Sequence, residues 1–342
     1  MMHRQNSIFS VANQILAVSV TLRPKITRSA GHCTRTGFRI FTTIAVMLMG
    51  FPIAGHCLEM TDAVHLFTIR HQFNAPSDVA VSRDNRIYVV DGVNQKIKVF
   101  NSGGAFLFDF GSQGSGPGEF QYPLGIDIDR SGRVYVADSG NHRVQVLTRD
   151  GGYIHEIKLQ GTGAHPADPT DVVVDDNLNR CYVVDNDNHR ILVYNAVSLK
   201  RIAVYGQAGA EKRQFRYPFQ IALDKAGYLY IVDVINTRVQ VLNPDGLFVT
   251  FIGDWGVEAG EFFRPKGIAI DRNGRVYVSD SYIGVIQVFR SLGEFHSVVG
   301  DRTTGALRKF KTPMGLCIDH RSRLYVVEML ANQVSVFQLK VE

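Results

Sequence analysis

Six copies of one pattern recur along this chain, and no other feature limits its fold as strongly. Neighbouring copies lie 46 to 49 residues apart, and each has a proline, an apolar run, a turn, a second apolar run that ends in an acid, and a third run. The prolines are Pro76, Pro123, Pro169, Pro218, Pro265 and Pro313, and the acids are Asp91, Asp138, Asp185, Asp233, Asp280 and Glu328. Repeats of this length with short, β-branched runs are typical of β-propeller blades.

Each copy is predicted to form four strands, which we letter a to d from the axis outward. Residues 129–132 and 271–274 supply Asp, Asn, Ser and Gly for tight a–b turns. The sixth copy ends after strand c, but residues 64–69 match the strand d pattern. Pairing this segment with the last strand c removes an exposed sheet edge. We therefore predict an all-β, six-bladed β-propeller of four-stranded antiparallel blades, closed by the N-terminal strand.

Residues 1–57 have the parts of an export signal. Arg35 and Arg39 precede an apolar run at 40–54, and small residues follow. The run is short for a membrane span, although an uncleaved N-terminal anchor is the alternative. We predict a leader at 1–57, a single propeller domain at 59–342, and an exported protein, periplasmic or extracellular. Membrane contact is expected only through an uncleaved leader.

The net charge of +5 resides in the leader, which holds six Lys and Arg and no acid. Subtracting these six from the 37 Lys and Arg leaves 31 basic residues against 32 Asp and Glu in the repeats. A nearly neutral propeller has no general attraction to phosphate backbones, so we expect no nucleic-acid partner. Cys181 and Cys317 lie in distant copies and are interpreted as buried apolar residues.

The copies resemble NHL repeats, a family named for an Asn-His-Leu stretch after strand b. Here that position holds Asn141-His142-Arg143, Asn188-His189-Arg190 and Asn236-Thr237-Arg238, whereas the fifth copy lacks the asparagine. The resemblance implies a six-bladed propeller of an exported bacterial type. Its functional range is broad, since the family includes lyases, sensor domains of kinases and ubiquitin ligases, RNA binders and many exported proteins.

The acids and histidines of the repeat could serve as metal ligands or as structural residues. We interpret the strand b acids as hydrogen-bond acceptors rather than a ring of ligands, and His142 and His189 as loop-packing residues rather than zinc ligands. Amidating lyases resembling this family place metal-binding histidines directly after the strand a proline, where this chain has none. Calcium-dependent lactonases need Glu, Asn and Asp near the axis, where only Asp78, Asp171 and Gln220 occur. We predict no catalytic residue, metal or cofactor.

The long d–a connections and the b–c loops share one face, and binding residues usually lie on such loops. Aromatic and Arg residues, which are enriched in interfaces, gather there. The predicted binding residues are Tyr122, Arg216, Tyr217, Phe219, Gln220, Trp255, Arg264 and Lys266. The alternative for Tyr122, Tyr217, Phe219 and Phe263 is packing between blades.

A basic sector crosses copies four and five and could meet an acidic glycan, polypeptide or lipid headgroup. It consists of Lys212, Arg213, Arg216, Arg264 and Lys266. We predict a non-catalytic module that binds a protein or a cell-envelope polymer on the d–a/b–c face. The alternatives are a metal-dependent lyase or lactonase-type enzyme, and a scaffold subunit of an envelope complex.

Overall fold

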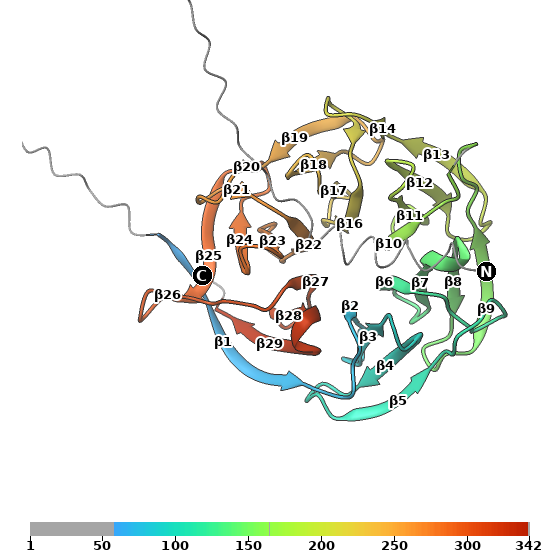
Figure 1. Ribbon diagram of the computed structural model, residues 1–342, viewed down its shortest axis with the longest axis horizontal. Helices are drawn as coiled ribbons and strands as arrows, with labels where there is room; N and C mark the ends of the chain where they lie inside the picture. Colours follow the sequence, from blue (N-terminus) through green and yellow to red (C-terminus); the bar gives the residue numbers. More distant parts are fainter. Residues whose placement is uncertain (1–57, 164, 341–342) are drawn as a thin grey trace, which may run out of the picture. The chain divides into compact units, whose positions relative to one another are not determined.

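The structure is a computed structural model that describes residues 58–163 and 165–340. The leader predicted at 1–57 lies outside the described residues. Each copy folds into a four-stranded antiparallel sheet, and six such blades are arranged in a ring around one axis (Figure 1). The predicted fold class, an all-β propeller of six blades, is therefore confirmed.

Strand a of every blade begins at the predicted proline. The six a strands are β2 (Pro76–Val81), β6 (Pro123–Ile128), β10 (Pro169–Asp175), β16 (Pro218–Leu223), β22 (Pro265–Ile270) and β27 (Pro313–Ile318). The b strands are β3 (Ile87–Asp91), β7 (Val134–Asp138), β11 (Arg180–Asp185), β17 (Leu229–Asp233), β23 (Val276–Asp280) and β28 (Arg323–Glu328). Proline at the first strand position needs no ladder donor, which explains its place there.

The outer strands complete the blades. The c strands are β4 (Lys96–Phe100), β8 (Arg143–Leu147), β12 (Arg190–Asn195), β18 (Arg238–Leu242), β24 (Val285–Phe289) and β29 (Gln333–Leu339). The d strands are β5 (Phe106–Phe110), β9 (Tyr153–Lys158), β13 (Arg201–Tyr205), β19 (Phe248–Ile252), β25 (Phe295–Asp301) and β1 (Met60–Ile69). Small ribbons occur in the d–a connections: β14 (Gln207–Ala208) with β15 (Gln214–Phe215), β20 (Asp254–Trp255) with β21 (Glu261–Phe262), and β26 (Ala306–Leu307) on β25.

The N-terminal strand closes the ring as predicted. β1 pairs antiparallel with β29, from Ala63 opposite Leu339 to Ile69 opposite Val334. The strand also begins earlier than expected, and Met60–Asp62 pair in parallel with Val298–Gly300 of β25. Blades five and six are thereby joined through β1, which follows the perimeter between them in Figure 1.

The core lies between the blades. One tyrosine from the middle of each b strand is fully or almost fully buried: Tyr88, Tyr135, Tyr182, Tyr230, Tyr277 and Tyr325. The apolar clusters join neighbours, as where Tyr88 and Val90 of blade one pack with Val134 and Val136 of blade two. Because every sheet is covered on both faces by its neighbours, the ring is a continuous core and the loops at its two ends are left for binding. No helix among the described residues is long and apolar enough to cross a membrane.

Candidate functional site

The acids that end the b strands hold the loop face together. Each is buried, and one of its oxygens accepts the backbone N–H of a residue one or two positions before the strand a proline of the same blade, at 2.7 to 2.9 Å. In four blades an asparagine three residues later donates its Nδ2 to the same acid and to a d–a carbonyl: Asn94, Asn141, Asn188 and Asn236. These contacts support the structural interpretation of the acids and assign the same role to the asparagine.

The motif histidines lie in the loops rather than beside one another. His142 has a positive φ and its Nδ1 lies 2.6 Å from the carbonyl of Ala167. His189 accepts the N–H of Tyr217 at 3.1 Å, and the two rings meet edge to face. Among residues 58–163 and 165–340, no group of three or more His, Cys, Asp and Glu is placed to hold a metal ion.

A second set of bonds fixes the b–c loops to the d–a connections. In every blade a b–c N–H donates to a carbonyl one or two residues before the proline, at 2.7 to 3.3 Å, as Ile235 does to Arg216 and Ser281 to Arg264. The backbone of the loops on this face is therefore held by a hydrogen-bonded framework.

The fifth blade departs from the pattern where the sequence lacks asparagine. Asp280 accepts the N–H groups of Tyr282 and Ile283 instead, each at 3.0 Å, and Gly284 takes a positive φ. The Tyr282 ring contacts Phe263 with centroids 4.3 Å apart, yet the residue is 67% exposed. The missing asparagine thus marks a loop that presents an aromatic ring to solvent.

Three polar side chains fill the centre of the ring. Asp78 accepts Nε2 of Gln220 at 2.8 Å, although their strands β2 and β16 belong to blades one and four. Each residue also accepts an N–H from the next strand a: Asp78 from Ile126, Asp171 from Ile221, and Gln220 from Ile268. Asp78, Asp171 and Gln220 therefore join the a strands across and around the axis.

Burial governs the charge of these carboxyls. It raises the pKa of Asp78 and of Asp171 above the usual aspartate range, and mutual repulsion adds to the increase for Asp171. Burial also raises the pKa of Asp127, which lies on β6, to about 7, although its oxygens accept the N–H groups of Ile128 and Val174. The axis therefore holds carboxyls that resist ionisation below neutral pH.

The residues directly after the prolines form an inner rim at the loop end of the axis. Phe219 packs against the apolar cluster of blades four and five, which includes Ile268, and also against the cluster of blades six and one, which includes Met314. Lys266 places Nζ 4.0 Å above the Phe219 centroid, a cation–π geometry. Burial, reinforced by the charge of Arg264, lowers the pKa of Lys266 to about 8.

The structure brings some of the predicted binding residues together and separates others. Phe219, Gln220 and Lys266 gather at the axis. Gln220 is buried and Phe219 is partly buried, so much of the surface of both side chains is used in packing within the protein. Arg216 and Tyr217 are exposed on the connection into blade four, and Trp255 is 68% exposed in the ribbon before blade five. Tyr122 and Arg264 are partly buried immediately before their prolines.

Exposed apolar residues in the b–c loops were not predicted. Ile235, Tyr282 and Leu330 are between 59% and 69% exposed, in blades four, five and six. The only signal in the sequence was an apolar residue at a turn position, and single apolar residues at turns are too common to indicate a binding site.

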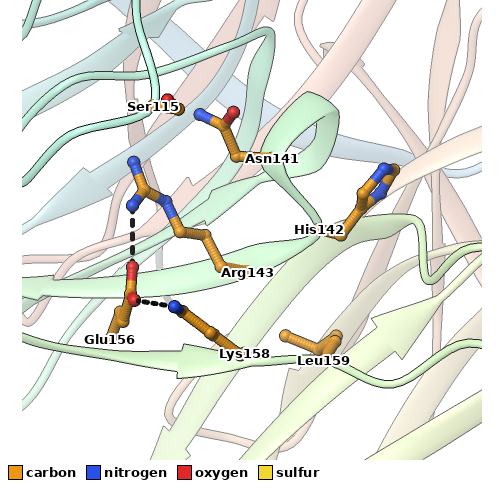
Figure 2. A pocket seen from close by; sticks show the side chains of 7 residues that line it. All are labelled: Ser115, Asn141, His142, Arg143, Glu156, Lys158 and Leu159. Carbon is orange, nitrogen blue, oxygen red and sulfur yellow. Dashed lines mark hydrogen bonds and ion pairs between the residues drawn. The ribbon is translucent and has the colours of Figure 1, made fainter.

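A cavity of about 310 Å³ lies beside blade two, between the d–a connection, the b–c loop and β9 (Figure 2). Its polar groups are already used: Arg143 bonds to Asp138 and Glu156, and Lys158 pairs with Glu156. Arg143 also donates to the carbonyls of Gly116 and Glu119. This cavity is therefore part of the blade framework, with few polar groups left for a ligand.

Comparisons with known proteins agree on the class that this geometry defines, a six-bladed β-propeller. A family model described as a 6-bladed beta-propeller matches residues 70–141 and 130–204. No curated protein matches the chain. Membership of the NHL family stays a prediction from the sequence.

Solved structures of several activities share the fold. A streptogramin B lyase is 12% identical with a TM-score of 0.61, covering 81% of this chain and 98% of its own. A gluconolactonase of Xanthomonas campestris is 13% identical with a TM-score of 0.60, over 81% and 92%. Hydrazine synthase of Kuenenia stuttgartiensis is 12% identical with a TM-score of 0.57, over 80% and 98%. At these identities the likeness shows the fold alone.

Proposed function

We propose that this chain is an exported, non-catalytic propeller that binds another protein through the d–a/b–c loops of blades four to six. The observation that carries the proposal is the exposure of large apolar side chains on one sector of a rigid loop face. Trp255, Val257, Ile235, Tyr282 and Leu330 are all between 59% and 69% exposed there. Among the described residues on the same face of blades one to three, Val93 is the one exposed large apolar residue, at 45%. Aromatic and aliphatic residues held on a rigid framework are typical of interface anchors.

The axis supports this function better than the lyase or lactonase alternative. The residues after the prolines include no histidine, and the carboxyl oxygens of Asp78 and Asp171 already accept hydrogen bonds from protein N–H groups. A metal site at this position would require these bonds to be exchanged for ligation. A scaffold subunit of an envelope complex is one form that the proposed protein binding can take.

Photo-crosslinking in the source cells tests the proposal. A photoreactive phenylalanine analogue is placed at Trp255 or Tyr282, and as a control at Leu292 or Leu247, which are 74% and 56% exposed in turns on the opposite face. We expect discrete protein adducts from the two loop-face positions and none from the controls. Equal adducts from both faces, or none from the loop face, would overturn the proposed interface.

A further inference from the structure

Charge is divided unevenly around the loop face. The d–a connections into blades four, five and six, residues 206–217, 253–264 and 302–312, hold eight Lys and Arg against four Asp and Glu. Those into blades one, two and three, residues 70–75, 111–122 and 159–168, hold one Arg against two acids. The excess comes from the connections into blades four and six, which hold three Lys and Arg against one acid and four against none, whereas the connection into blade five, which carries Trp255, holds one Arg against three acids.

Several cations of these connections, and Lys266 at the start of β22, have no carboxylate partner within the described part of the chain. Lys212, Arg213, Arg216, Lys266 and Lys311 form no ion pair among residues 58–163 and 165–340, whereas Arg143, Arg190 and Arg238 pair with the b strand acids. Lys212 and Lys266 lie over phenylalanine rings, with Nζ 5.1 and 4.0 Å from the centroids of Phe248 and Phe219. These amines are positioned but not neutralised.

Lys266 is the most constrained of them. Its side chain is partly buried on the inner rim, directly after the buried Pro265 in the sequence. Its ammonium lies over the ring of Phe219. A partly desolvated ammonium beside a second cation, Arg264, gains more from an incoming carboxylate than an exposed lysine does. The lowered pKa of Lys266 has the same cause and would rise when a carboxylate binds.

We infer, building on the proposed function, that the partner presents an acidic polypeptide segment with apolar side chains to blades four to six, and that one of its carboxylates pairs with Lys266. The positive charge of the connections into blades four and six, together with Lys266 between them, selects an acidic ligand. The exposed Trp255, Tyr282 and Leu330 select a polypeptide over an anionic polysaccharide, because uronate chains carry no aliphatic or aromatic side chains to bury against them.

Fluorescence anisotropy with defined polymers tests this inference on the full chain. The probes are a labelled random copolymer of glutamate and tyrosine, poly-L-glutamate, and polygalacturonate. We expect the copolymer to bind most tightly and polygalacturonate most weakly. Binding should weaken between about 50 and about 200 mM salt, because part of it is electrostatic.

Lys266→Met keeps the stem over Phe219 and removes the charge. We expect it to weaken copolymer binding about tenfold, while Lys225→Met, at an exposed turn on the opposite face, leaves binding unchanged. NMR of the Lys266 side chain should show its pKa rising in the complex. Equal binding by the Lys266→Met variant, or polygalacturonate binding as tightly as the copolymer, would overturn the inference.

The two proposals can fail separately. If crosslinks form at Trp255 or Tyr282 but the copolymer does not bind, the face binds protein and the acidic chemistry is wrong. If crosslinks are absent from the loop face and the copolymer still binds, the basic sector binds anions but has no protein partner in the cell. The proposed protein-binding function is then wrong.

Discussion

Replacing Asp127 by asparagine should change how the stability of the protein depends on pH. Burial raises the pKa of this carboxyl from 3.8 to about 7, so the folded protein keeps the proton where the unfolded chain has lost it. Asp127 therefore contributes stability that is fully present below pH about 4 and is lost as the pH rises to about 7. Asparagine does not titrate, and its Oδ1 can still accept the N–H of Val174.

The structure sets the size of the effect. A shift of about three pH units corresponds to about 4 kcal/mol, and since Asp127 is only partly buried by surface area we expect about 2 kcal/mol. The unfolding free energy of Asp127→Asn minus that of the wild type should become more positive by this amount between pH 4.5 and 7.5, then level off. Urea denaturation at each pH measures it.

Asp129 provides an internal control, because its pKa is shifted in the opposite direction to that of Asp127. Burial of Asp129 is outweighed by hydrogen bonds from Ser131 and Arg133, so the pKa of Asp129 is lowered and both its folded and unfolded states titrate below the tested range. The Asp129→Asn difference should therefore stay constant from pH 4.5 to 7.5. A constant difference for Asp127→Asn as well, or one that falls as the pH rises, would refute the argument from burial.

Two further substitutions test the framework of the loop face and the axis. Asp233→Ala leaves the N–H of Arg216 and the guanidinium of Arg238 without their buried acceptor, and should cost about 3 to 5 kcal/mol in urea denaturation; a loss under about 1 kcal/mol would contradict the role of the acids. Gly125→Ala would place a Cβ 2.6 Å from the Asp171 Cα and should cost about 1 to 3 kcal/mol, whereas Gly103→Ala, with 3.5 Å to its nearest neighbour, should be nearly neutral. Equal melting temperatures for the two alanine variants would refute the close packing at the axis.

The repeat carried most of the fold prediction because each signal is local. The prolines begin the a strands and the acids end the b strands, and the length of the last copy predicted the closing strand. The parallel pairing of Met60–Asp62 with β25 could not be predicted, since three residues carry no pattern that distinguishes this partner. This pairing depends on how close the outer strands of blades five and six lie to each other.

The site was harder to predict for a similar reason. The sequence places Asp78 and Gln220 near the axis, but whether the two side chains meet depends on a distance across the ring. Phe219 and Lys266 were predicted as separate binding residues and turn out to be one stacked pair. Tyr282 was missed although the fifth copy lacks the motif asparagine, because that absence seemed to weaken a resemblance rather than to mark an exposed loop.

The closing strand has a consequence for how the protein is made. Among the described strands β1 comes first along the chain and its antiparallel partner β29 comes last, so β29 emerges from the ribosome after all the others described. Until β29 has emerged, β1 lacks its antiparallel partner and blade six lacks strand c, so the ring cannot close. A nascent or truncated chain is therefore a set of blades that a protease or chaperone can still open. Quality control of this protein would act on the pairing of β1 with β29.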